Sequence, residues 1–421
     1  MKEIGCFVYM TLPGRTEAVV AGRLEIEQTG IEPVGRFVYG QSYLGNPDAV
    51  PIDPMEIAAL ENKVFTHVGD NGMFWAFRDS SPDFWGRTVI QRALGAELDE
   101  VGYLLNSPDD RAGALGFGTG PRPPAPERKF NRTLDLEELQ QTADDILADR
   151  EVVDRHNAEQ VERLLLHGTS MGGARPKAVV EDGEALWIAK FSRQDDTYNV
   201  PIVEHSMLEL ARECGISTAQ SKLVTIGGRH VLMVKRFDRD KADCGWLRYR
   251  MVSGLTTLET GESDRSRWSY PILADAVRRL SSNFRSDLDD LFRRVTFNML
   301  ISNDDDHPRN HALLARNRSW SLSPAYDLTP RSSIATSRFL AMSMGNGNRA
   351  ATKENLFSEL DRFMIETDEA EEIVAKLSAI IERRWYGICR ENGLPEADCE
   401  RIRLAFGNEG FDWAEPVAPT P

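Results

Sequence analysis

A dense group of polar residues follows an apolar stretch in the segment "FNMLISNDDDHPRNH", residues 297–311. Three consecutive aspartates are followed closely by two histidines, an arginine and an asparagine. An isolated run of charges of this kind is most often a solvated helix end. The alternative is that carboxylate, imidazole and amide groups converge on one chemical task, and their spacing indicates which task that is.

One candidate task is zinc binding. His307 and His311 are four positions apart, which would place both imidazoles on one face of a helix. Pro308 stands between them and disfavours a regular helix. A zinc protease motif would also require a glutamate at the position that Pro308 occupies. The sequence therefore gives zinc binding little support.

A second candidate task is phosphoryl transfer. Asp305 and Asn310 are five positions apart, the same spacing as the catalytic Asp and the metal-binding Asn of the protein-kinase catalytic loop. In that loop the Asp accepts the proton of the acceptor hydroxyl and the Asn binds Mg²⁺, which prefers oxygen ligands. This spacing also occurs in small-molecule kinases, so alone it is weak evidence.

Four further features stand in the order that a kinase requires. The segment "GTSMGGARPK" would form a glycine-rich phosphate loop, and Lys190 in "LWIAKF" would bind the phosphates from a strand. Glu204 lies on a predicted helix and would pair with that lysine, and Asp327 follows two strand-like runs as a second metal ligand. Each has an ordinary alternative: a solvated strand lysine, an exposed helix residue, a turn cap or a glycine turn. Together they favour a kinase.

The N-terminal elements are predicted from hydrophobic periodicity and turn residues. The runs "GCFVYMTLPG", "EAVVAGRLEIEQTG" and "GRFVYGQSYL" indicate strands, so the first hundred residues are expected to be β-rich. The segments "DPMEIAAL" and "SSPDFWGRTVIQRALG" are predicted helices, with Asp53 and Ser81 as their caps. The proline-rich segment "GTGPRPPAPERKFNR" is predicted to be a linker or an exposed loop.

The remaining elements follow the same signals. We expect a helix at "LDLEELQQTADDILA", strands at residues 178–180 and 186–191, and a helix from residue 200 that ends at Gly215. The segment "SKLVTIGGRHVLMVKRFDR" is a predicted hairpin with Gly227 and Gly228 at its turn. After Trp246 the chain is expected to be mainly helical, with a frayed end at "EPVAPTP".

Size and composition narrow the class of protein. A chain of 421 residues is expected to form two or three structural units, and its net charge of −16 argues against broad nucleic-acid binding. Five cysteines without CxxC spacing suggest reduced thiols and no disulfide framework. The chain starts directly with a strand-like run and contains no apolar run near the roughly 20 residues of a membrane span. We therefore expect a cytoplasmic protein without a membrane partner.

The order of "GTSMGGARPKA", "WIAKF", "VPIVEHSMLELARECGI", "VKRFDR", "SNDDDHPRNHALL" and "LSPAYDLTP" resembles the HipA family of serine/threonine kinases, the toxins of type II toxin–antitoxin operons. The segments "WGRTVIQRAL" and "YLLNSPDDRAGALGF" are also similar to that family, so the resemblance covers nearly the whole chain. It implies an α+β, protein-kinase-like two-lobed fold with a β-rich N-terminal part and a mainly α-helical C-terminal lobe. The implied domains are a β-rich N-terminal subdomain at residues 1–130, a kinase N-lobe at 131–246 with phosphate loop, lysine strand and hinge, and a helical C-lobe at 247–421 with catalytic loop and metal site.

The resemblance also implies roles for single residues. Asp305 would be the catalytic base, His307 would support its loop, and Asn310 and Asp327 would bind Mg²⁺. Ser170 would be an autophosphorylated loop serine. The implied ATP-binding residues, of which the last two belong to the adenine-contacting hinge, are Ser170, Gly172, Gly173, Ala174, Lys177, Lys190, Glu204, Lys235 and Phe237.

The implied function is that of an ATP- and Mg²⁺-dependent kinase toxin that phosphorylates a translation protein, for example an aminoacyl-tRNA synthetase such as glutamyl-tRNA synthetase, and inhibits itself by autophosphorylation. A HipB-like helix-turn-helix antitoxin would be its partner and its only route to DNA. Two alternatives remain: a catalytically weak, antitoxin-binding co-regulator of its operon, and a small-molecule kinase. The intact Lys190, Asp305, Asn310 and Asp327 count against the first. The long β-rich N-terminal region and "GGARPK" count against the second.

Overall fold

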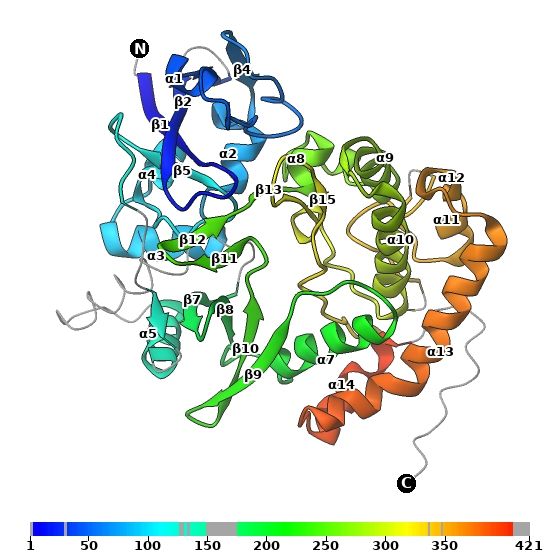
Figure 1. Ribbon diagram of the computed structural model, residues 1–421. Coiled ribbons are helices and arrows are strands. Elements are labelled where there is room, and N and C mark those ends of the chain that lie inside the picture. The colour runs from blue at the N-terminus through cyan, green and yellow to red at the C-terminus, as the bar shows by residue number, and fades with distance from the viewer. Residues whose placement is uncertain are drawn as a thin grey trace. The chain divides into compact units, whose positions relative to one another are not determined.

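The computed structural model describes residues 3–28, 32–125, 130–132, 135–148, 175–335, 337–346 and 348–406 (Figure 1). The chain forms two compact units. Unit 1 comprises residues 1–194, 233–261 and 314–320, and unit 2 comprises residues 195–232, 262–313 and 321–421. The chain therefore passes between the units several times.

Unit 1 is rich in strands. Its elements are β1 (Glu3–Thr11), β2 (Ala18–Glu27), β3 (Val34–Tyr39), α1 (Gln41–Leu44), β4 (Val64–Val68), η1 (Asp70–Gly72), α2 (Trp75–Asp79), α3 (Phe84–Leu94), α4 (Glu100–Asn106), β5 (Leu115–Gly118), β6 (Asn131–Arg132), α5 (Leu136–Leu147), β7 (Lys177–Asp182), β8 (Ala185–Phe191), β11 (Arg239–Ala242), β12 (Gly245–Arg248), β13 (Arg250–Ser253) and α8 (Gly254–Leu258).

The first sheet of unit 1 has the strand order β4-β3-β2-β1-β5, and all of its described pairs are antiparallel. Alternate residues of β2, such as Leu24 and Ile26, are buried, as expected for a sheet with one face on the core. On that face Phe37 packs edge-on against Tyr39 and Phe77, with ring centroids 5.0 and 5.4 Å apart. Such aromatic pairs stabilise a fold by more than the burial of their apolar area alone.

In unit 1, β6, β7 and β8 lie side by side in a second sheet, and β9 (Ser221–Ile226), in unit 2, pairs with β10 (Arg229–Lys235). Strands β7 and β8 lie where two strands were predicted and form an antiparallel hairpin, in which Lys177 lies opposite Lys190. The predicted hairpin of β9 and β10 is also confirmed. Gly227 and Gly228 both have positive φ at its turn, a conformation that glycine adopts without steric cost.

Unit 2 is mainly helical. Besides β9 and part of β10, its elements are α7 (Val200–Glu213), η3 (Arg265–Arg267), α9 (Tyr270–Leu280), α10 (Phe284–Leu300), η4 (Pro308–Asn310), β15 (Ser321–Leu322), α11 (Lys353–Phe357), α12 (Leu360–Phe363), α13 (Thr367–Glu391), α14 (Glu396–Ile402) and η5 (Arg403–Ala405), and β14 spans Ala312–Ala315. The longest helix, α13, packs against α7 and α10, and α9 also packs against α10.

Helix α7 follows its predicted signals closely. The side chain of Asn199 accepts a hydrogen bond from the backbone N–H of Ile202, and Pro201 lies in the first turn. Gly215, with a φ of 82°, follows the last turn as predicted. The β-rich N-terminal part and helical C-terminal part predicted from the sequence are thus confirmed.

Three local predictions were wrong. The segment "DPMEIAAL" contains no helix, because Asp53 accepts hydrogen bonds from the backbone N–H groups of Met55 and Ile57 and closes a turn instead. Helix α3 is capped by Asp83, which accepts from the Gly86 N–H, and Ser81 lies before the cap. The residues "QSYL" form the short helix α1 rather than a continuation of the strand.

Several predictions fall outside the described residues or stay predictions. Ser170, Gly172, Gly173 and Ala174 lie outside the described ranges, as does the segment "EPVAPTP". The division into domains at residues 130 and 246 stays a prediction. All five cysteines are free thiols, four of them buried. Within the described ranges, no helix is both long and apolar enough to cross a membrane.

Candidate active site

The loop after α10 joins Asp305 to Asn310 in unit 2. Pro308 starts the short 3-10 helix η4, which reverses the chain between the two residues. The His307 N–H donates to the Asp305 carbonyl at 2.8 Å, and the Asn310 N–H donates to the His307 carbonyl at 2.9 Å. The Asn310 side-chain amide donates to the Asp305 carbonyl at 3.3 Å. The two residues selected for their five-position spacing are therefore directly hydrogen-bonded.

The last aspartate of the run, Asp306, holds this loop against the core. Oδ2 of Asp306 accepts hydrogen bonds from Asn298 Nδ2 at 2.7 Å, from His311 Nε2 at 2.8 Å and from the Tyr270 hydroxyl. The side chains of Asp306 and His311 are only 2% and 3% exposed. Asp306 thus anchors both ends of the loop, a role that the sequence analysis did not assign to it.

The Tyr270→Phe variant is expected to lose about 1.5–3 kcal/mol of unfolding free energy, because it removes one buried hydrogen bond to a charged acceptor. Urea denaturation measures this loss. Tyr326→Phe is the matched control: its hydroxyl donates to the neutral Arg309 carbonyl at 2.7 Å, so its loss is expected to be about 0.5–1.5 kcal/mol. A Tyr270→Phe loss no larger than that of the control would contradict the proposed anchor.

Asp305 itself points to the surface and is suited to accept a proton. Partial desolvation by the surrounding loop raises the pKa of the Asp305 carboxyl, His307 opposes this shift, and the charge of Asp327 adds to it. A raised pKa brings a carboxylate closer to the value at which a general base is most effective near neutral pH. The influence of Asp327 also indicates that the two carboxylates lie near each other.

Asp327 has an unusual backbone conformation. Its φ of 60° lies in the left-handed region, which non-glycine residues adopt at a cost and which is often found at functional sites. The preceding residues are fixed by a hydrogen bond from the Ala325 N–H to the Ser217 carbonyl at 2.7 Å and by the Tyr326 hydroxyl. The position of Asp327 is therefore set by its neighbours.

In unit 1 the predicted lysine strand is present, and Lys190 is half-buried on β8. Lys177, opposite it on β7, is 2% exposed, and its Nζ lies 2.5 Å from Oδ2 of Asp83. The carbonyl of Lys177 also accepts a hydrogen bond from the Trp85 indole at 3.2 Å. Lys177 therefore has an ionic partner within unit 1, and its predicted ATP contact stays a prediction.

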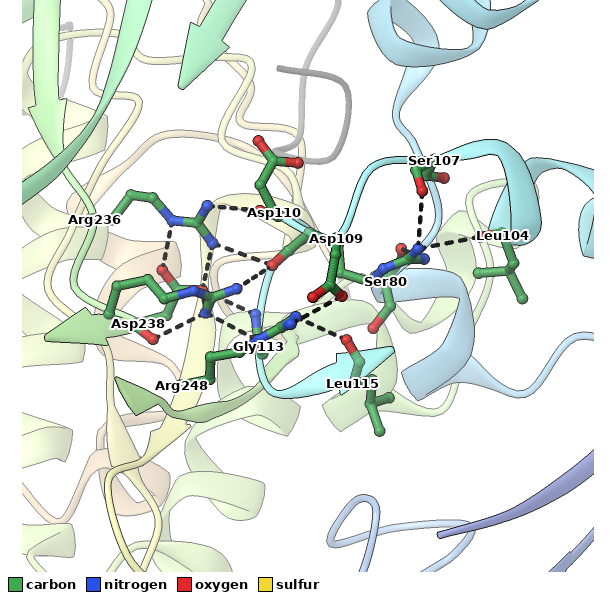
Figure 2. Close-up of polar contacts among 12 residues, drawn as sticks. Ser80, Leu104, Ser107, Asp109, Asp110, Gly113, Leu115, Arg236, Asp238 and Arg248 are labelled. Carbon is green, nitrogen blue, oxygen red and sulfur yellow. Dashed lines mark hydrogen bonds and ion pairs between the residues drawn. The ribbon is translucent and has the colours of Figure 1, made fainter. Parts of the chain in front are cut away.

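The predicted hinge of unit 1, Lys235 and Phe237, is held by the residues between and after them. Arg236 is buried, and its guanidinium binds both carboxylate oxygens of Asp238 at 3.0 and 2.9 Å (Figure 2). The same guanidinium donates to the Asp110 and Arg111 carbonyls at 2.6 and 3.1 Å. The hinge is thereby fastened to the loop that follows α4.

Asp238 is the centre of this buried network. It also accepts from the Gly113 N–H at 2.9 Å and from Arg239 at 2.7 Å. Burial alone would raise the pKa of the Asp238 carboxyl, but Arg236 and Arg239 outweigh burial and hold the pKa well below its usual value. Figure 2 shows Arg248 extending the network, with one bond to Asp109 at 3.0 Å.

Glu204 lies on α7 in unit 2 and is only 2% exposed, so the alternative of an exposed helix residue is wrong. A buried carboxylate requires a partner. Its predicted partner Lys190 belongs to unit 1, and that pairing stays a prediction.

Asn310 and Asp327 supply one amide and one carboxylate oxygen, a donor set that fits Mg²⁺. Among the described residues, no group of three or more His, Cys, Asp and Glu side chains is arranged to hold a metal ion.

Comparison with known proteins identifies the family. The model of the HipA-like C-terminal domain matches residues 169–385, slightly more than half of the chain. The chain therefore belongs to the HipA family. A Haemophilus influenzae protein that is provisionally named a kinase is 24% identical over 152 residues, which are 33% of this chain and 44% of that protein. The chain thus matches less than half of that relative's length.

Among solved structures, the HipA of Shewanella oneidensis MR-1, determined with HipB and operator DNA, is similar to the chain with a TM-score of 0.67. The similarity covers 95% of this chain and 94% of that one at 16% identity, so it supports the fold alone. The Helicobacter pylori proinflammatory kinase CtkA is similar over 56% of this chain at 14% identity, with a TM-score of 0.43, which is too low to establish a shared fold.

Proposed function

We propose that the chain is an ATP- and Mg²⁺-dependent serine/threonine protein kinase of the HipA type. The observation that carries the proposal is the catalytic loop of unit 2. In that loop Asp305 is exposed and hydrogen-bonded to Asn310, and buried Asp306 anchors the chain between them.

Each residue would have a distinct task. Asp305 would accept the proton of the acceptor hydroxyl as the oxygen attacks the terminal phosphate of ATP. Asn310 and Asp327 would bind Mg²⁺, which offsets phosphate charge when it is bound. Lys190, supported by Glu204, would contact the phosphates. Lys235 and Phe237 would contact the adenine, with Ser170, Gly172, Gly173 and Ala174 in the loop over the phosphates.

We further propose that the chain acts as a toxin regulated by a HipB-like antitoxin. The solved relative from Shewanella oneidensis is a complex with HipB and operator DNA, and the net charge of −16 disfavours direct DNA binding by this chain. An acceptor in translation, such as an aminoacyl-tRNA synthetase, and inhibition by phosphorylation of Ser170 complete the proposal. Arg175 or Lys177, the second of which is paired with Asp83, would bind a phosphate on Ser170.

Nucleotide binding is expected to require magnesium. ATP at about 100 times its dissociation constant should raise the unfolding free energy by about 2.7 kcal/mol with Mg²⁺ present. Replacing Mg²⁺ with EDTA should remove most of that gain, because the phosphates would then lack their counter-charge. Differential scanning fluorimetry measures the shift, and Asp327→Asn should lose the Mg²⁺ dependence. Equal shifts in Mg²⁺ and EDTA would contradict the metal site.

A further inference from the structure

A groove in unit 2 lies beside the proposed catalytic base. It has a volume of about 390 Å³, within the usual range for ligand sites, and its lining includes Asp305 and His307. Three arginines, Arg265, Arg331 and Arg349, also line it. We call this surface the arginine groove. It is more basic than the strongly acidic chain as a whole.

Backbone hydrogen bonds hold each of the segments that carry the three arginines of the groove. The Ser343 N–H donates to the Trp268 carbonyl at 2.8 Å, and the Leu340 N–H donates to the Arg349 carbonyl at 3.0 Å. The Arg331 N–H donates to the Ser302 carbonyl at 3.1 Å, next to the catalytic loop. These backbone bonds place the arginines on a fixed frame rather than on one loop.

Two of the arginines, Arg265 and Arg349, carry charges that could bind an anionic ligand. Arg331 forms an ion pair with Asp304 at 3.4 Å, and this pair partly neutralises its charge. Arg265 lies over the Trp268 ring, 5.1 Å from its centroid, and Arg349 is exposed. Neither Arg265 nor Arg349 forms an ion pair with a carboxylate in the part of the chain that the structure describes. Their unpaired charges make the groove complementary to an anionic ligand.

The surface around the groove suits a polypeptide better than a small molecule. Phe339, which lines the groove, is 56% exposed, and Ile334 on the same segment is 93% exposed. Large apolar side chains exposed beside a polar site are typical of protein-binding surfaces. A peptide would cover these apolar groups, whereas a small anion would leave them in water.

We propose that the arginine groove binds an acidic peptide segment of the acceptor protein, with its carboxylates at Arg265 and Arg349 and its target hydroxyl at Asp305. The inference rests on the proposed function, since it takes Asp305 as the residue that meets the acceptor hydroxyl. It adds a substrate preference: acidic residues flank the phosphorylated serine or threonine.

Binding of labelled peptides to the full chain tests this inference without requiring catalysis. Three serine peptides of equal length carry flanking Glu and Asp, flanking Gln and Asn, or flanking Lys. Fluorescence anisotropy at low salt should show the acidic peptide binding roughly tenfold more tightly than the neutral one, with the gap shrinking as salt screens the charges. The Lys peptide should bind most weakly. Equal binding of all three would overturn the inference.

The double variant Arg265→Gln/Arg349→Gln should bind the acidic peptide no better than the neutral one. The control Arg278→Gln/Arg285→Gln removes the same charge from exposed positions on α9 and α10 and should keep the preference.

If the groove double variant instead weakens ATP binding and leaves peptide binding intact, the arginines bind the nucleotide and the inference is wrong. Equally efficient phosphoryl transfer from ATP to the acidic and the neutral peptide would contradict the acidic preference but not the proposed kinase activity. Charge-selective peptide binding without any phosphoryl transfer would contradict the proposed kinase activity but not the binding of acidic peptides by the arginine groove.

Discussion

The Asp305→Asn variant is expected to lose phosphoryl transfer by about 10³-fold or more, because it removes both the proton acceptor and the charge that positions the hydroxyl. Its ATP affinity should change less than about threefold, since Asn310 and Asp327 are intact and a general base is not required for binding. Steady-state transfer to an acceptor protein and ATP titration by fluorimetry measure the two quantities on one preparation.

Asp304→Asn is the matched control for this prediction. Asp304 is the adjacent residue and carries the same charge, but its side chain pairs with Arg331 on the surface. Such a surface pair contributes little, so Asp304→Asn should keep transfer within about tenfold of the wild type. Wild-type turnover in Asp305→Asn, or equal losses in the two variants, would show that Asp305 is not the base.

The Asp238→Asn variant is expected to lose about 3–5 kcal/mol of unfolding free energy, because it leaves the buried guanidinium of Arg236 without its counter-charge. Arg236 and Asp238 have side chains only 0% and 1% exposed. Asp240→Asn is the control: Asp240 is half exposed and pairs with Arg316 at 3.0 Å, so its loss should stay below about 1 kcal/mol. Chemical denaturation of the three proteins measures both losses.

The pH dependence gives this prediction a second test. The folded-state pKa of Asp238 lies below its unfolded value, so its contribution is present above the unfolded pKa and is lost as pH falls toward the folded one. The stability gap between wild type and Asp238→Asn should therefore narrow on acidification below about pH 4. A gap that stays constant or widens in acid would contradict the ion-pair account.

The sequence predicted the elements that carry strong local signals. Helix α7 has an asparagine cap, a proline in its first turn and a glycine after its end, and each acts locally. The turn at Gly227 and Gly228 has the same character. The segment at Asp53 was mistaken for a helix because an aspartate followed by proline fits a helix start and a side-chain-closed turn equally well.

The candidate site was predictable where spacing alone defines it. The five positions between Asp305 and Asn310 led to a pair that is hydrogen-bonded in the structure. Asp306 was not predicted as the anchor, because its partner Tyr270 is distant in sequence and only the tertiary fold brings them together. The same five-position step joins Asp306 to His311, and this was the one local signal that could have identified it.

The buried network at the predicted hinge was missed for a related reason. The letters "VKRFDR" were interpreted through Lys235 and Phe237, although the structure buries Arg236 and Asp238 instead. Charged side chains are rarely buried, so composition predicts the opposite placement. Only the loop after α4, far away in sequence, supplies the carbonyl groups that make the burial favourable.

The most direct test of kinase activity is transfer of labelled phosphate from ATP·Mg²⁺ by the purified chain in a lysate of its host, with labelled proteins identified by mass spectrometry. The wild-type chain is expected to label a lysate protein on serine or threonine and itself on Ser170, and Asp305→Asn is expected to label neither at equal ATP occupancy. No label from a wild-type chain that binds ATP·Mg²⁺, or equal label from Asp305→Asn, would show that the chain is not a kinase that uses Asp305 as its base.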